Sequence, residues 1–220
     1  FPMVATPLLA LFTDLQTAIV LTLIPTLLVN LISIISEGNI LLASRRHLSL
    51  ALLAMLGSAI GTQILLFVNS EIFKVLLGVV ILIYLLLEKI KLKLSWIKEQ
   101  PNFSKFTFGL TAGLVGGLTN VMAPVLIIYS LESKHSKSDT IQASNLCFLL
   151  GKIIQIILFS VYGAFTQNAL SISSVMLIVT VLALYVGISV RKKIEIKVYQ
   201  KILRTLLFTL ALVLLIQVSI

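Results

Sequence analysis

The stretch from Phe108 to Tyr129 reads FGLTAGLVGGLTNVMAPVLIIY, an apolar run interrupted by four glycines, by Asn120 and by Pro124. Glycine and proline weaken a helix, and proline also removes a backbone hydrogen bond. We therefore predict two half-helices, from Phe106 to about Gly117 and from about Met122 to Leu131, with an irregular turn between them. At a rise of about 1.5 Å per residue, each half is expected to reach only partway across a bilayer.

The composition of the chain indicates an integral membrane protein. Of its 220 residues, 59% are apolar and 11% are charged, whereas a soluble domain has about 45–50% and about 25%. This excludes a soluble enzyme, a secreted disulfide scaffold and a disordered tail. The single cysteine, Cys147, is predicted to be a small buried residue. The net charge of +9 comes from basic residues between apolar runs, so no nucleic-acid partner is expected.

Six further apolar runs are predicted to cross the membrane, since a spanning helix needs roughly 20 apolar residues or fewer where the bilayer thins. A seventh, Pro2 to Phe12, is too short to span. Gly57 and Gly61 have the spacing that suits close helix packing. The six runs are Leu15–Ser36, His47–Val68, Ile72–Leu87, Thr140–Tyr162, Leu170–Val190 and Ile202–Ile220.

The two halves of the chain resemble each other. MVATPLL at residues 3–9 is similar to NVMAPVL at residues 120–126, and each is followed by a polar break and three long helices. The predicted fold is an all-α polytopic membrane protein with two repeats, each a broken or re-entrant segment plus three transmembrane helices. Residues 1–88 form the first repeat, 89–105 a basic cytoplasmic linker and 106–220 the second repeat. The chain begins inside an apolar run, so the first repeat is expected to lack the leading half of its broken segment.

The positive charges predict the topology. The two largest basic clusters lie at Lys89–Lys105 and Arg191–Arg204, and positive loops face the cytoplasm. A re-entrant hairpin over 106–131 puts both clusters on one face, and the two repeats then have inverted topology. Secondary transporters with inverted repeats bind their substrates near the bilayer midplane, at broken helices. A single kinked spanning helix is the alternative, and it would separate the clusters.

Lys152 is the strongest candidate for a binding residue, because it lies well inside the predicted helix Thr140–Tyr162. A charge at the bilayer centre costs several kcal/mol, and all eight acidic residues lie in or beside loops. The remaining partners are carbonyls at the broken turns, water or an anionic substrate. Asn145 and Gln155 fall on the same helix face as Lys152. A structural lysine bound to carbonyls is the alternative.

The break at Asn120–Pro124 is the second candidate. The N-terminus of a half-helix brings free N–H groups and a positive dipole end into the membrane interior, which suits an anion. Thr119 and Asn120 add polar side chains, and Thr6 and Pro7 would do the same in the first repeat. A packing kink is the alternative. Thr26 and Asn30 either line the same cavity or bond across helices.

No catalytic constellation is apparent: the sequence has no HExxH or GxSxG pattern and no paired acids inside the apolar runs. We therefore expect no enzyme, metal site or cofactor.

The stretch from Phe108 to Tyr129 resembles the second-repeat signature of the sulfite exporter TauE/SafE family of bacterial membrane transporters. FPMVATPLL at residues 1–9 resembles the tail of the first-repeat signature. The resemblance implies export or uptake of small sulfur-containing anions, such as sulfite or sulfonates, without ATP. Met122 and Ala123 stand where many relatives carry glycine.

The sequence therefore predicts a secondary transporter that moves a small anion, sulfite or an organosulfonate, across the bacterial inner membrane by alternating access. Lys152 would supply positive charge, and Asn145 and Gln155 would orient the anion. The anion, the lipid bilayer and a coupling ion, whose identity is left open, are the expected partners. An anion channel and a non-transporting membrane assembly subunit are the alternatives.

Overall fold

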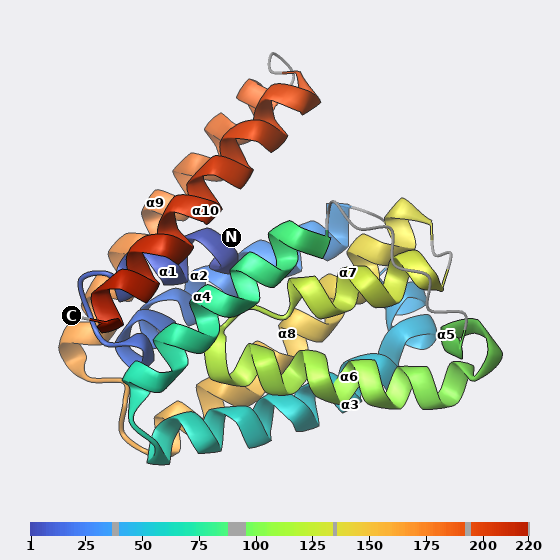
Figure 1. The fold of residues 1–220 in the computed structure, drawn as a ribbon, viewed down its shortest axis with the longest axis horizontal. Coiled ribbons are helices and arrows are strands. Elements are labelled where there is room, and N and C mark those ends of the chain that lie inside the picture. The colour runs from blue at the N-terminus through green and yellow to red at the C-terminus, as the bar shows by residue number, and fades with distance from the viewer. Residues whose placement is uncertain (37–39, 88–95, 134–135, 192–194, 220) are drawn as a thin grey trace.

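The computed structural model is helical throughout the residues that it describes, which are 1–36, 40–87, 96–133, 136–191 and 195–219. Figure 1 shows how these helices are arranged. In chain order they are α1 (Pro2–Ala10), α2 (Leu15–Ser36), α3 (Ile40–Phe67), α4 (Ser70–Leu87), α5 (Trp96–Glu99), α6 (Pro101–Thr119), α7 (Ala123–Glu132), α8 (Lys137–Val161), α9 (Gln167–Arg191) and α10 (Ile196–Ser219).

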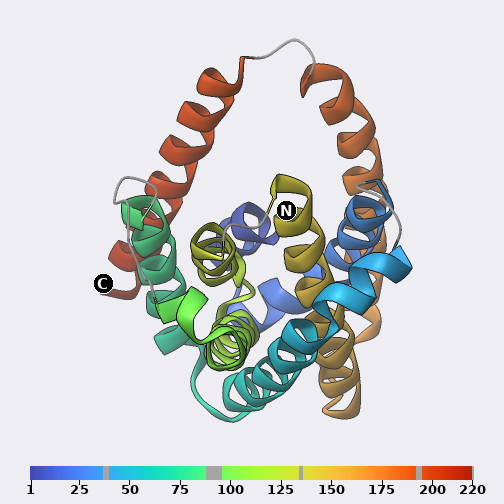
Figure 2. The same cartoon turned by 90° about the vertical axis from the view of Figure 1, so that its right-hand side faces the viewer.

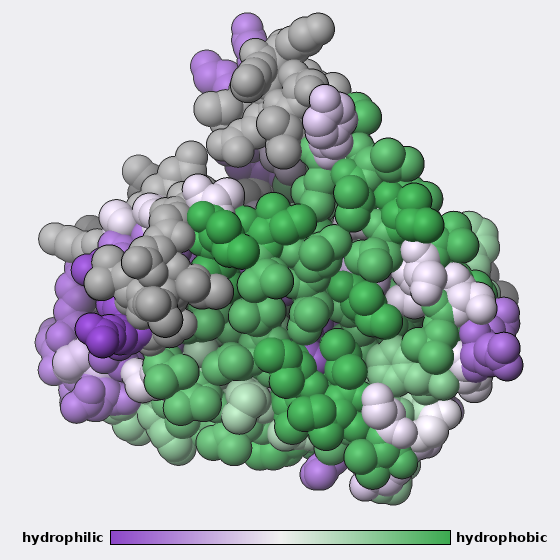
Figure 3. All heavy atoms as spheres, turned by 180° about the vertical axis from the view of Figure 1, so that it is seen from behind, coloured by the Kyte–Doolittle hydropathy of each residue, from purple (hydrophilic) through white to green (hydrophobic). Residues whose placement is uncertain are grey.

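Five of the described helices, namely α2, α3, α8, α9 and α10, are long and apolar enough to cross a membrane. The predicted span Ile72–Leu87 coincides with α4, but α4 is not among these five. Figure 3 shows apolar side chains over the middle of one face and hydrophilic ones toward its two ends, as expected for a surface that meets lipid.

The predicted break in the glycine-rich run is present between α6 and α7. Asn120 ends α6 in the left-handed region, with φ of 67°, and its N–H bonds the carbonyl of Gly116 at 2.8 Å. After the break, α7 turns back alongside α6 (Figure 1). Asparagine is one of the few residues that adopt this backbone conformation readily.

The prediction that both half-helices are short was wrong for α6. It begins at Pro101 rather than Phe106 and has 19 residues, or about 28 Å at the usual rise. Proline fits the first turn of a helix, because the N–H that it lacks has no partner there. The 10 residues of α7 reach only about 15 Å, as predicted.

The helix α3 also starts earlier than the predicted run His47–Val68, so that Arg45 and Arg46 are helical. Arginine is a good helix former, and the apolar pattern alone does not register this. The lysines at positions 89, 91, 93, 134, 192 and 193, on which part of the charge argument depends, lie outside the described residues.

Glycines let α3 and α6 approach closely. A Cβ atom added to Gly61 would lie 2.4 Å from the carbonyl oxygen of Leu114, and one added to Gly113 would lie 2.0 Å from that of Ala54. Both distances are far below van der Waals contact. The predicted packing role of Gly57 and Gly61 is therefore confirmed.

The remaining helices surround this pair. The helix α8 packs on both α3 and α2, α9 packs on α2, and α10 packs on α4. In Figure 2, α9 and α10 lie on opposite sides of the molecule and lean toward each other as they extend beyond the other helices.

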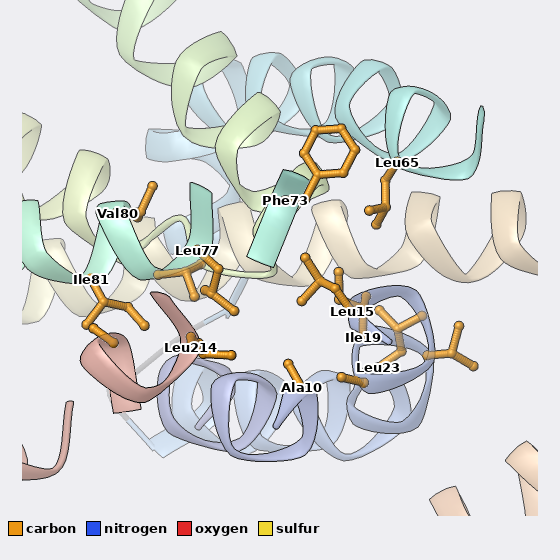
Figure 4. Close-up of a cluster of buried hydrophobic side chains, with 14 of the residues drawn as sticks. Ala10, Leu15, Ile19, Leu23, Leu65, Phe73, Leu77, Val80, Ile81 and Leu214 are labelled. Carbon is orange, nitrogen blue, oxygen red and sulfur yellow. The ribbon is translucent and has the colours of Figure 1, made fainter. Parts of the chain in front are cut away.

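Two apolar cores divide the molecule. The first core joins α1, α2, α3, α4, α8 and α10, and Figure 4 shows Leu15, Ile19 and Leu23 of α2 in it. The second core joins α2, α3, α5, α6, α7 and α8 and contains Cys147, which is fully buried as predicted.

Candidate polar site at the helix break

Lys152 lies at the centre of a buried polar cluster. Its side chain has an exposed fraction of 0%. Its Nζ donates hydrogen bonds to Oδ1 of Asn120, at the helix break, and to Oε1 of Gln155, one turn along α8. Within the described part of the chain no carboxylate pairs with Lys152. Two neutral amide oxygens take the place of a counter-ion.

Asn120 connects this lysine to the first half of the chain. Its Nδ2 donates to Oγ1 of Thr6 at 2.6 Å and to Oγ1 of Thr22 at 2.9 Å. The two hydroxyls are 3.4 Å apart, and both threonines are fully buried. One asparagine therefore makes the turn between α6 and α7 and also joins α1, α2 and α8.

Gln155 and Gly151 attach the cluster to the glycine-packed helices. Nε2 of Gln155 donates to the carbonyl of Gly117 at 3.4 Å, and Oγ of Ser58 donates to the carbonyl of Gly151 at 3.3 Å. A Cβ atom on Gly151 would lie 2.7 Å from Cε of Met122. The cluster is therefore closely surrounded by side chains and backbone.

The electrostatics of this cluster favour an anionic ligand. A protonated Lys152 has only dipoles to offset its charge, and removal of an ion from water without a counter-charge is costly. An anion bound at Nζ would supply that counter-charge. In the described residues no group of three or more histidine, cysteine or acidic side chains is placed to hold a metal ion.

A protein-family model described as Sulfite exporter TauE/SafE matches residues 1–214 of this chain. The chain belongs to this family. No curated protein and no solved structure matches it. As a TauE/SafE protein it is a multi-pass membrane transporter and not an enzyme, and its family implies a sulfur-containing anion as substrate. The whole polar cluster lies inside the matched region.

In this TauE/SafE chain, four of the eight predicted binding residues come together: Lys152, Asn120, Gln155 and Thr6. Asn145 does not contact them. It lies about two turns away on α8, where its Nδ2 donates to Oγ of Ser33 and to the carbonyl of Ile141, each at 2.9 Å.

The other three predicted residues have different positions. Thr119 is buried, but its hydroxyl donates to the carbonyl of Val115 at 2.7 Å and accepts the N–H of Val121 at 3.3 Å, so it closes the end of α6. Pro7 and Pro124 are buried inside α1 and at the start of α7. Neither proline has a polar side chain or an N–H to offer.

The predicted backbone donors at the start of α7 are partly occupied. The N–H of Val121 bonds Thr119, the N–H of Leu126 bonds the carbonyl of Met122 at 3.3 Å, and Pro124 has none. Two of the backbone donors near this helix start are therefore already bonded, and Pro124 has no N–H to offer.

Sequence reasoning missed Thr22. Its hydroxyl accepts from Asn120 and donates to the carbonyl oxygens of Ile19 and Ala18, at 2.9 and 3.0 Å. One signal was available: Thr22 lies one turn before Thr26 and two turns before Asn30, so it belongs to the same face of α2.

Proposed function

We propose that this TauE/SafE chain is a secondary transporter that moves a small sulfur oxyanion, sulfite or an organosulfonate, by alternating access. The central site is the cluster of Lys152, Asn120, Gln155, Thr6 and Thr22. The observation that carries the proposal is the complete burial of Lys152 with only neutral partners.

The cluster can exchange its internal hydrogen bonds for bonds to an anion. An oxyanion at Nζ of Lys152 would displace the amide oxygens of Asn120 and Gln155. Rotation of either amide then presents an NH2 donor in place of the oxygen. The hydroxyls of Thr6 and Thr22 lie beside the Asn120 amide and can donate as well. Three oxygens of a sulfite or sulfonate group match such a set of donors.

Helix packing supports two repeats that meet at this site. In the proposed repeats α1 corresponds to α7, α2 to α8 and α3 to α9. The corresponding pairs pack alike: α1 contacts α2 and α7 contacts α8, while α2 contacts α9 and α8 contacts α3. Asn120 of the second proposed repeat bonds Thr6 and Thr22 of the first. Movement of one repeat relative to the other would therefore change the contacts of the bound anion, which is what alternating access requires.

Thermal stability in the presence of anions tests the site. A ligand that binds only the folded state stabilises it by about 2.7 kcal/mol at a hundredfold excess over Kd. We expect sulfite or methanesulfonate to raise the Tm of the purified wild-type protein but not that of Lys152→Met. Lys74→Met is the matched control. Lys74 is also buried, but its Nζ pairs with Oε1 of Glu71 at 3.1 Å, so its replacement should leave the anion effect intact.

Flux in proteoliposomes separates the transporter from its alternatives. A secondary transporter gives saturable uptake and counterflow of labelled anion, and Lys152→Met should abolish both. An anion channel gives flux without saturation or counterflow. A non-transporting assembly subunit gives fluxes that Lys152→Met does not change, and that result would overturn the proposal.

A further inference from the structure

A row of polar side chains runs along one face of α2 beyond the central cluster. Thr22, Thr26, Asn30 and Ser33 are spaced by about one turn each, so they share a face. Thr22 and Thr26 have exposed fractions of 0%, and Asn30 has 4%. Buried polar side chains in a membrane helix face other helices or a water-filled cavity.

Hydrogen bonds at both ends of this row show that it lies along α8. Thr22 bonds Asn120, which in turn bonds Lys152, and Ser33 bonds Asn145. From the Thr22 end of the row to the Ser33 end, residue numbers increase along α2 but decrease along α8, from Lys152 to Asn145. The two helices therefore run antiparallel. Thr26 and Asn30 therefore lie on the stretch of α2 between the levels of Lys152 and Asn145.

The middle of the row has unused hydrogen-bonding groups. Oγ1 of Thr26 and Nδ2 of Asn30 are buried and have no hydrogen-bond partner among the described residues. A buried donor without a partner is rare in folded proteins, and it needs a water, an ion or a ligand to satisfy it. Both groups can donate to an anion, and neither carries a charge that would hold the anion permanently.

The other direction from Lys152 is apolar. One turn beyond Gln155 on α8 lies Phe159, and before Thr22 on α2 lie Ile19 and Leu15, all with exposed fractions of 0%. They belong to the first core (Figure 4), which continues to Leu65 and Leu77. Such a core offers no hydrogen bonds to an anion.

We propose that Thr26 and Asn30 form a second, weaker anion-binding site between α2 and α8. The site lies on the route from Lys152 to the end of the molecule where Arg46 of α3 pairs with Asp139 of α8. It takes a compact oxyanion such as sulfite or a small sulfonate and holds it before or after the anion reaches Lys152. This inference rests on the proposed function and names the path by which the same substrate arrives or leaves.

Cysteine protection tests this site without any need for flux. In full-length protein with Cys147→Ala, we expect Asn30→Cys to react with a negatively charged thiosulfonate reagent, and we expect Ile19→Cys, in the first core, not to react. Methanesulfonate, which does not attack thiols or disulfides as sulfite does, should slow the Asn30→Cys reaction. Failure of Asn30→Cys to react, or a rate that methanesulfonate leaves unchanged, would overturn the inference.

Transport by near-isosteric variants gives the second readout. Loss of one hydrogen bond to a charged ligand weakens binding by about tenfold or more. We therefore expect Thr26→Val and Asn30→Leu each to raise the half-saturating anion concentration by about that factor. Their Tm without ligand should not fall, because each change removes a buried group that has no partner. Thr180→Val is the matched control, since Thr180 is a buried threonine on α9, with 6% exposure.

The two proposals fail in different ways. If Lys152→Met abolishes flux while Thr26→Val and Asn30→Leu transport like the wild type, the second site is wrong and the central site stands. If Lys152→Met leaves flux unchanged, the proposed function itself is wrong. Protection of Asn30→Cys by methanesulfonate in that case would establish an anion site that does not depend on Lys152.

Discussion

The two ends of the molecule offer anions very different surroundings. At one end, which we call the basic end, a pocket of about 270 Å³ is lined by Arg46, His47, Ser49, Leu50, Lys105, Tyr129 and Asp139. At the opposite end, a pocket of about 420 Å³ is lined by neutral residues: Thr13, Gln16, Thr17, Val20, Leu21, Ala164, Thr166, Asn168, Ala169 and Ile172. Either pocket has room for a small sulfonate, and only the first has charged side chains.

If the two proposed repeats share a fold, this difference comes from their side chains. The basic pocket lies where α3 and α8 begin, and the neutral pocket lies where α9 and α2 begin. In the proposed repeats these are corresponding helix ends, so similar backbones carry different side chains. Positive charge raises the local concentration of anions and speeds their capture, although it cannot drive net transport. For the proposed transporter we therefore predict that anions are captured faster at the basic end than at the neutral end.

The largest effect is expected from Phe159→Ala, which opens the apolar seal between Lys152 and the neutral end. Phe159 is fully buried in the first core, and such a truncation costs about 3–5 kcal/mol. We expect a marked fall in Tm, and Ile19→Cys should become reactive from the neutral end. Phe103→Ala is the control, since Phe103 is 56% exposed near the basic end. Equal Tm values for the two variants would show that the first core is not a seal.

A smaller effect is expected from charge changes at the basic end. Nη1 of Arg46 lies 2.5 Å from Oδ1 of Asp139, and the Arg46 side chain is 60% exposed. Arg46→Gln should raise the half-saturating anion concentration at this end severalfold, and Asp139→Asn should lower it by freeing Arg46. Both effects should shrink as salt screens the charges. Stability should change little, because exposed ion pairs contribute little.

Lys201→Gln provides the control for that experiment. Lys201 is exposed on α10 and does not line the basic pocket. A similar change in half-saturation for Lys201→Gln would mean that net charge matters and the pocket does not.

The sequence predicted the helices and the break well, because both depend on local properties. Apolar length places α2, whose bounds match the predicted Leu15–Ser36, and glycine and proline place the turn at Asn120. The site was harder to predict. Lys152 and Gln155 are neighbours on one helix, so their contact follows from spacing. The contacts of Asn120 with Thr6 and Thr22, by contrast, join residues 114 and 98 positions apart, and no periodicity shows them.

The predicted anion site at the half-helix terminus stays a prediction, with fewer free N–H groups than expected. The dipole argument considers the free N–H groups as a set, whereas here Thr119 occupies one and Pro124 removes another. Asn145 does not contact the Lys152 cluster, and it bonds Ser33 and Ile141 instead. It shares a helix face with Lys152, but two turns separate them. A shared face means that two side chains point the same way, and it does not mean that they lie at the same level along the helix axis. Local patterns identified which residues are polar and buried, and only the packing of distant helices decides which of them meet.

The smallest perturbation tests which compartment each end faces. In a Cys147→Ala background, Ser136→Cys lies at the basic end, at the N-terminus of α8, and Thr166→Cys lies at the neutral end. Both positions are exposed, so neither change should alter Tm by more than the loss of a helix cap. The proposed topology predicts that an impermeant thiol reagent labels Ser136→Cys only from the cytoplasm and Thr166→Cys only from outside. Labelling of both positions from the same side would contradict the proposed inverted repeat, because the two positions lie at opposite ends of α8. Labelling of Ser136→Cys from outside would overturn the re-entrant hairpin and the inverted repeat together, because a single kinked spanning helix over 106–131 would carry the start of α8 to the side opposite the basic linker.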